Sequence, residues 1–180
     1  MEPQPALTWK LAGNRPLNHP HRRLGALAEL AAQWSKLSKL VPRQGTDPLV
    51  NWPKRIRQLL GELEHEFWSH HYTLASSLVE KPMALIGKDR INDILGNILF
   101  PLAVGHHPWQ WDAYIELPGS VENQKLRRAS IRLFGEHPDQ KKFTKRFYQQ
   151  QALLQIYEDF CLEDVSECAD CPFPEQLSQW

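Results

Sequence analysis

The stretch KDRINDILGNILFPLAV, residues 88–104, is the most apolar helical pattern in the chain and decides the fold. Its large apolar residues recur every three or four positions and cover most of a helical surface, which is typical of a helix at the centre of a core. They are Ile91, Ile94, Leu95, Ile98, Leu99 and Leu102. We therefore predict a central helix over residues 88–103. Pro101 should kink or end it, because proline lacks the backbone N–H that a helix needs.

Other segments with helical periodicity flank this stretch on both sides, and prolines or polar residues bound them. They cover residues 22–41, 53–72, 120–134 and 139–160. Pro53 suits the first position of its helix, and Ser120 and Asp139 are suitable N-caps. The first segment should pack on the core through Leu24, Leu27, Ala28, Ala31, Trp34, Leu37 and Val41. Clean period-two strands are absent, so the sequence predicts an all-α fold, a five- or six-helix orthogonal array with a cysteine-containing C-terminal tail.

Length and composition indicate an ordinary globular chain. The 180 residues predict a single helical domain over residues 1–180, with an N-terminal loop over residues 1–20 and a cysteine tail over residues 161–180. The formal net charge is zero, so the chain as a whole is not an electrostatic binder of nucleic acid. No apolar run is long enough for a membrane span and the start carries no export signal. With an odd count of 3 cysteines, this predicts a cytoplasmic protein without a membrane partner.

Charge is distributed unevenly in the last third of the chain. A basic region covers residues 125–146. In the region that follows it there is no Lys or Arg, and all of the charged residues are acidic. Basic side chains interleaved with aromatic ones suit a nucleic-acid backbone. The candidate nucleic-acid-binding residues are Lys125, Arg127, Arg128, Arg132, Lys141, Lys142, Lys145 and Arg146. The alternative is a solvated helix face whose aromatic side chains point inward, or a basic face that the acidic tail neutralises.

The cysteines lie together near the end of the chain, in the spacing C-x6-C-x2-C. Thiolates at such spacing can reach one metal ion, so Cys161, Cys168 and Cys171 are candidate ligands for zinc or an iron–sulfur cluster. The spacing resembles the iron–sulfur loop of the endonuclease-III class of DNA glycosylases, but Leu177 stands where that loop has its fourth cysteine. No fourth ligand is identified, and free thiols or an opportunistic disulfide are the alternative. The tail should pack Phe173 or Trp180 against the helices.

Catalytic signatures are missing from the sequence. It has no glycine-rich phosphate loop, no nucleophile elbow and no zinc-binding H-E-x-x-H pattern. Most histidines occur in close pairs whose side chains point apart, which is typical of helix ends and surfaces. We therefore predict no catalytic residues, and the sequence favours a chain that is not an enzyme by itself.

Four phrases resemble a bacterial family, the domain of unknown function 2851. They are LAGNRPLNHPHRRLGALAEL (11–30), GKDRINDILGNILFPLA (87–103), LPGSVENQKLR (117–127) and QQQALLQIYEDFCLEDVSECADCPFP (149–174). The resemblance is to the C-terminal half of that family and implies a helical module with a cysteine tail. It implies no activity and no residue roles, and it allows a protein partner that supplies the N-terminal half.

Polar residues within the first two of these phrases form a further candidate site. Asn18, Arg23, Arg90 and Asn97 are expected to form a polar pocket. Asn97 falls inside the most apolar helix, where a buried amide must find hydrogen-bond partners or cost about 1–3 kcal/mol. Guanidinium groups lie at the helix starts, those of Arg22, Arg23 and Arg90, and one of them can tie the NRPLNHP loop, residues 14–20, to the core. A structural tie and a functional pocket both fit this pattern.

The functional hypothesis is a non-catalytic helical module that binds nucleic acid or supports a separate catalytic partner. The alternative hypothesis is a structural or protein-interaction domain with a cysteine-rich, metal-binding tail. The distribution of charge over the folded chain discriminates the two, because an acidic tail packed across the basic face would remove the surface that a nucleic acid needs.

Overall fold

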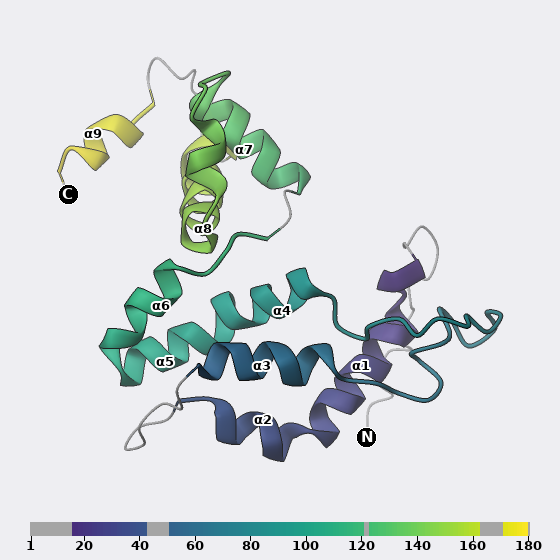
Figure 1. Cartoon of the computed structure of the whole chain (residues 1–180). Coiled ribbons are helices and arrows are strands. Elements are labelled where there is room, and N and C mark those ends of the chain that lie inside the picture. The colour runs from purple at the N-terminus through teal and green to yellow at the C-terminus, as the bar shows by residue number, and fades with distance from the viewer. Residues whose placement is uncertain (1–15, 43–50, 121–122, 163–170, 180) are drawn as a thin grey trace, which may run out of the picture. The chain divides into compact units, whose positions relative to one another are not determined.

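The computed structural model describes residues 16–42, 51–120, 123–162 and 171–179 (Figure 1). Regular structure in these ranges is helical, apart from an isolated bridge between Pro118 and Arg146, so the all-α prediction is confirmed. No helix within them is long and apolar enough to cross a membrane. The chain divides into two compact units, Met1–Ile91 and Asn92–Trp180, which are described one at a time. The single domain expected over residues 1–180 stays a prediction.

The first unit is built from short helices and one long irregular segment (Figure 1). Its elements are η1 (Pro16–Asn18), α1 (Pro20–Ala32), α2 (Trp34–Leu40) and α3 (Trp52–Gly61), and α4 (Lys88–Ile94) starts at its end. The helix expected over residues 22–41 is interrupted at Gln33, which caps α1 and opens α2. Helix α3 begins as predicted, with Pro53 in its first turn, and buries Trp52, Ile56 and Leu60 on one face.

The apolar face of α1 and α2 was expected in the core, and this prediction is wrong for most of it. Leu24, Leu27 and Trp34 are 47%, 59% and 62% exposed, and only Leu37 of the expected set is buried. Helix α1 instead buries Arg22, Gly25 and Ala26. A side chain at Gly25 would meet the Trp68 indole, since a Cβ atom there would lie 2.2 Å from its Cδ1. The close approach of this indole to the helix backbone sets which face of α1 turns inward.

The helix expected over residues 53–72 ends early, at Gly61, and no helix follows before α4. Side chains bind the backbone of this segment instead. His65 Nδ1 accepts from the backbone N–H groups of Phe67 and Trp68, at 3.0 and 3.2 Å. Ser76 Oγ accepts from the N–H groups of Tyr72 and Thr73. Side chains that satisfy nearby backbone donors compete with helix formation, which explains the early end.

Arg22 fixes the long irregular segment to α1. Its side chain is 2% exposed, and its guanidinium donates to three backbone carbonyls. The acceptors and distances are Trp68 O at 3.2 Å, Met83 O at 3.1 Å and Ala84 O at 2.8 Å. Burial lowers the pKa of this guanidinium, and the nearby Tyr72 opposes the shift. A guanidinium tie was expected at the NRPLNHP loop, residues 14–20, but the tie that Arg22 makes is to carbonyls within residues 68–84.

The central helix is confirmed, and a π-helical turn interrupts its α-helical geometry. Helix α4 runs directly into the π-helix η2 (Leu95–Leu99) and then into α5 (Phe100–His106). Pro101 therefore does not end the helix. The wider turn precedes it, and such turns relieve the requirement for an i to i−4 hydrogen bond. The extra residue in the π turn also changes the inward face, so that Leu99 and Ala103 are buried while Ile98 and Leu102 are exposed.

The second unit continues with η3 (Pro108–Gln110) and α6 (Trp111–Ile115), and then with a helical hairpin. The hairpin consists of α7 (Gln124–Phe134), η4 (Gln140–Thr144), α8 (Phe147–Ile156) and the π-helix η5 (Tyr157–Leu162), and α9 (Phe173–Leu177) follows. Leu126, Ala129 and Leu153 form its buried core. Asn123 caps α7 by accepting from the Leu126 N–H, so the expected N-cap at Ser120 is wrong.

Candidate nucleic-acid interface

Helix α7 carries one buried and one basic side. Leu126, Ala129 and Ser130 are buried, and all of the cations of this helix are exposed. At 100° per residue, Lys125, Arg128 and Arg132 share a stripe, because they are spaced i, i+3 and i+7. Arg127 shares the other margin of the outward side with Ile131 and Phe134, at i, i+4 and i+7. The outward half of α7 is therefore bordered by cations on both margins.

The 3-10 helix η4 adds the second group of cations. The expected helix over residues 139–160 is interrupted here, because Arg146 has an extended backbone with φ −103° and ψ 151°. The neighbouring backbone pairs with the LPGS segment: Gly119 N–H donates to Lys145 O, and Phe147 N–H donates to Leu117 O, both at 2.9 Å. Pairing with this segment explains the interruption, because these backbone groups are then not available to a continuous helix.

Gln150 fixes η4 to the start of α8. Its side-chain amide accepts from Ser120 N–H at 3.0 Å and donates to Ser120 O at 3.0 Å and Thr144 O at 2.9 Å. Gly119 lies against this amide, since a Cβ atom there would be 2.3 Å from Nε2. A buried amide with three hydrogen bonds holds the basic segment in one conformation. We did not recognise Gln150 from the sequence as a polar anchor, although a glutamine within the apolar stripe of a helix was the available signal.

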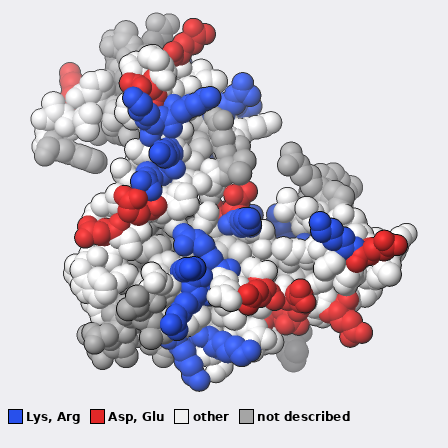
Figure 2. All heavy atoms as spheres, viewed as in Figure 1, with Lys and Arg blue, Asp and Glu red and all other residues white. Residues whose placement is uncertain are grey.

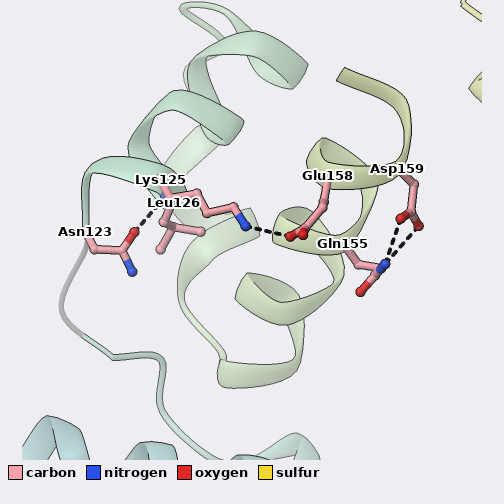
Figure 3. Close-up of polar contacts among 6 residues, drawn as sticks. All are labelled: Asn123, Lys125, Leu126, Gln155, Glu158 and Asp159. Atoms are coloured by element: carbon pink, nitrogen blue, oxygen red, sulfur yellow. Dashed lines mark hydrogen bonds and ion pairs between the residues drawn. The ribbon is translucent and has the colours of Figure 1, made fainter. Parts of the chain in front are cut away.

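Among the described residues, three of the eight predicted cations form ion pairs. Lys125 Nζ lies 2.5 Å from Glu158, Lys142 Nζ lies 2.6 Å from Asp139, and Arg146 Nη2 lies 2.7 Å from Glu116. Figure 3 shows the first of these pairs joining α7 to η5, beside the Asn123 cap of α7. Within the described ranges, the remaining cations make no ion pair. They are Arg127, Arg128, Arg132, Lys141 and Lys145.

We call the exposed cations within residues 125–146, which lie on α7, in η4 and at Lys145 directly after η4, the basic surface. Figure 2 shows Lys and Arg side chains gathered over the α7–α8 part of the second unit, with acidic side chains at the margins. Only Glu158 of the acidic tail region contacts a predicted cation through a described ion pair. Residues 163–170 lie outside the described ranges. Each ion pair as exposed as these contributes less than about 1 kcal/mol to the stability of the fold, so a phosphate can compete with the carboxylate for the cation.

Two aromatic residues of the basic region differ in their exposure. Phe147 is 1% exposed and points inward, as the alternative interpretation expected. Phe143 is 42% exposed, so the same expectation is wrong for it. Its ring stacks on Phe134, with centroids 4.7 Å apart and planes inclined by 25°. An aromatic ring is therefore available to solvent among the cations of η4.

The cysteine tail is described only in part. Cys161 and Cys171 are half-buried and form no disulfide with each other, and Cys168 lies outside the described residues. The described side chains contain no cluster of three or more metal-ligating groups. Phe173 of α9 packs on Phe160 of η5 with ring centroids 5.1 Å apart, which confirms that Phe173 joins the tail to the helices. Clustering of all three sulfurs and metal binding stay predictions.

The residues of the expected polar pocket are all exposed. Asn18 ends η1, Arg23 lies in α1, Arg90 lies in α4, and Asn97 lies in the π turn of the second unit. The burial of Asn97 was the reason for expecting partners around it, and this burial is wrong. Gly96, its neighbour, takes the inward position and would place a Cβ atom 2.2 Å from the Phe147 ring. The pocket itself stays a prediction, and the buried guanidinium is that of Arg22.

The histidines of the first unit bind the backbone locally. His70 Nδ1 donates to Val79 O at 2.8 Å, and His71 Nδ1 donates to Ser76 O at 2.9 Å. The His71 ring also stacks on Phe67. His70 and His71 were expected at helix ends or surfaces, but they are half-buried in the irregular segment that Arg22 holds, and they position its backbone.

Comparison with known proteins identifies the family. A family model described as "Protein of unknown function (DUF2851)" matches residues 1–115. Neither the curated proteins nor the solved structures contain a match to the chain. The first two phrases that carried the resemblance lie within the matched range, and the basic surface lies beyond it. Correspondence to the C-terminal half of the family stays a prediction. The match covers more than half of the 180 residues, and the chain belongs to the DUF2851 family.

Proposed function

We propose that the second unit binds nucleic acid through the basic surface, without catalysing a reaction on it. The observation that carries this proposal is a set of exposed cations on α7, in η4 and directly after η4 that make no ion pair within the described residues. They are Arg127, Arg128, Arg132, Lys141 and Lys145. Phosphates are the natural partners for cations on a surface of this kind. The buried Gln150 amide supports the proposal because it holds η4 in place before binding.

Binding through phosphates is independent of base sequence and depends strongly on salt. The chain would then act as a helical binding module beside a separate catalytic partner. A bacterial cytoplasm is the proposed compartment, in keeping with the odd number of cysteines.

Charge reversal tests this proposal. The double variant Arg128→Glu/Arg132→Glu changes two exposed cations of α7 and should weaken binding of a fluorescent oligonucleotide at low salt by at least tenfold. The matched control is Lys54→Glu/Arg55→Glu, which changes two exposed cations of α3 in the first unit by the same total charge. Equal weakening in both variants would mean that net charge alone acts, and would contradict a defined surface. Absence of binding by the wild-type chain at low salt would refute the proposal.

A protein-interaction domain is the second candidate function. The ion pair between Lys125 and Glu158 favours it, since it begins to neutralise the basic helix within the fold. Copurification of a stoichiometric protein partner, together with an absence of nucleic-acid binding, would favour this candidate over the first.

A further inference from the structure

An exposed aromatic ring lies within the basic surface and has a supported face. Phe143 stacks on Phe134, and Phe134 packs against the hairpin core of Leu126, Ala129 and Leu153. One face of the Phe143 ring lies against Phe134, and the His137 ring lies nearby, with its centroid 6.3 Å away and its plane inclined by 50°. Beside these two rings, Phe143 is still 42% exposed. Phe134 therefore supports the Phe143 ring, and the exposed part of the residue is accessible to a partner.

Cations flank this ring in positions that suit a nucleic-acid backbone. Lys141 and Lys142 precede it directly in η4, and both are exposed. Arg127 lies on the margin of α7 that leads to Phe134 through Ile131, at i, i+4 and i+7 spacing. Ile131 is also exposed, so this margin presents apolar surface beside a cation. Cations beside an open aromatic ring are the combination that single-strand binding proteins use.

The backbone under the ring is already ordered. Thr144 O, next to Phe143, accepts from the buried Gln150 amide at 2.9 Å. Gly119 N–H donates to the next carbonyl, Lys145 O. The ring therefore does not need to be ordered at the moment of binding, which lowers the entropic cost of stacking a base on it.

We infer that Phe143 is a stacking platform for an unpaired base, so that the basic surface prefers single-stranded over duplex nucleic acid. This inference rests on the proposed function and names its substrate class. Bases within a duplex are stacked on one another and do not offer their faces, whereas every unpaired base has a face that a ring can cover. Discrimination comes from this ring, and the cations bind phosphates of either form.

The test compares a thymine oligonucleotide that contains 2-aminopurine with a duplex of the same length. Phe143→Leu keeps an apolar side chain against Phe134 but removes the ring, and it should lower single-strand affinity by about 5- to 100-fold. Duplex affinity should stay within about twofold, since phosphate contacts are unchanged. Phe143→Tyr keeps the ring and should retain single-strand binding together with the change in 2-aminopurine fluorescence. Phe173→Leu, on α9, is the control for loss of a phenylalanine elsewhere in this unit.

The outcomes separate this inference from the proposed function. Equal binding of both forms by the wild type, or equal behaviour of the Leu and Tyr variants at Phe143, would overturn the stacking platform while leaving electrostatic binding intact. Absence of binding to either form would refute the proposed function itself. Far-ultraviolet circular dichroism and urea midpoints identify any variant that fails to fold. If Phe143→Leu does not fold, Phe143→Tyr is compared with the wild type, and a loss of the preference for single strands in Phe143→Tyr would overturn the inference.

Discussion

Replacing Arg22 should release the long irregular segment of the first unit. The guanidinium is almost fully buried and satisfies the carbonyls of Trp68, Met83 and Ala84. Arg22→Met keeps the length and apolar stem of the side chain but removes every donor. The substitution therefore leaves three part-buried carbonyl acceptors without the partner that the folded chain gives them.

The magnitude follows from these contacts. A hydrogen bond from a charged donor contributes about 1.5–3 kcal/mol, and a buried carbonyl without a partner costs about 1–3 kcal/mol. The three bonds share one guanidinium and do not add, so we expect Arg22→Met to reduce the free energy of unfolding of this unit by about 3–5 kcal/mol. A loss of about 3 kcal/mol corresponds to roughly a 100-fold increase in the population of the open form.

Hydrogen exchange measured by mass spectrometry checks this locally. The amides of Val79 and Met83, which bond to His70 O and Ser69 O, should exchange roughly 100-fold faster in Arg22→Met. The control is Arg23→Met, which removes the adjacent exposed guanidinium and should change stability by less than about 0.5 kcal/mol. Equal exchange in the two variants, or no change in Arg22→Met, would refute the role of the buried guanidinium.

The remaining predictions concern the second unit. Gly96→Ala should destabilise it by about 1–3 kcal/mol, because the new methyl group overlaps the buried Phe147 ring, whereas Gly105→Ala meets no atom within 4 Å and should raise stability by up to about 1 kcal/mol in urea unfolding. Burial raises the pKa of the Tyr114 phenol, so its folded-state pKa exceeds the unfolded value of 10.0. The stability that the protonated phenol contributes is complete below about pH 10 and is lost as the pH rises through the folded-state pKa. Tyr114→Phe should remove this part of the loss of stability at alkaline pH, which circular dichroism measures while absorbance follows ionisation of the phenol. Metal analysis of anaerobically purified protein beside Cys168→Ser tests the cysteine tail: zinc or iron that is stoichiometric in the wild type and lost in the variant would support a metal centre, and equal trace amounts in both would contradict it.

Local patterns predicted the elements whose burial follows regular periodicity. The central helix and the start of α3 at its proline are correct, because spacing and capping are set by neighbouring residues. The same patterns failed where geometry departs from 3.6 residues per turn. The π turn at Leu95–Leu99 moves Asn97 and Ile98 to the outside, and no periodicity analysis at a fixed angle can find that shift.

Contacts between distant residues account for the other differences. The segment after Gly61 is irregular because His65 and Ser76 bind its backbone and Arg22 reaches it from 46 to 62 residues away. Exposure of the apolar face of α1 follows from the indole that packs on Gly25. In the candidate interface, the sequence identified the cations, but the Phe134–Phe143 stack depends on how η4 folds back along α7.

The salt dependence of binding tests the proposed nucleic-acid surface most directly. If the five cations that make no ion pair among the described residues each contact one phosphate, log affinity for a single strand should fall against log salt with a slope of about −3.5. An increase from about 50 to 200 mM salt should then weaken binding about 100-fold, and Arg128→Glu/Arg132→Glu should make the slope shallower by about 1.4. A slope near zero, or a slope that this double variant leaves unchanged, would contradict the account.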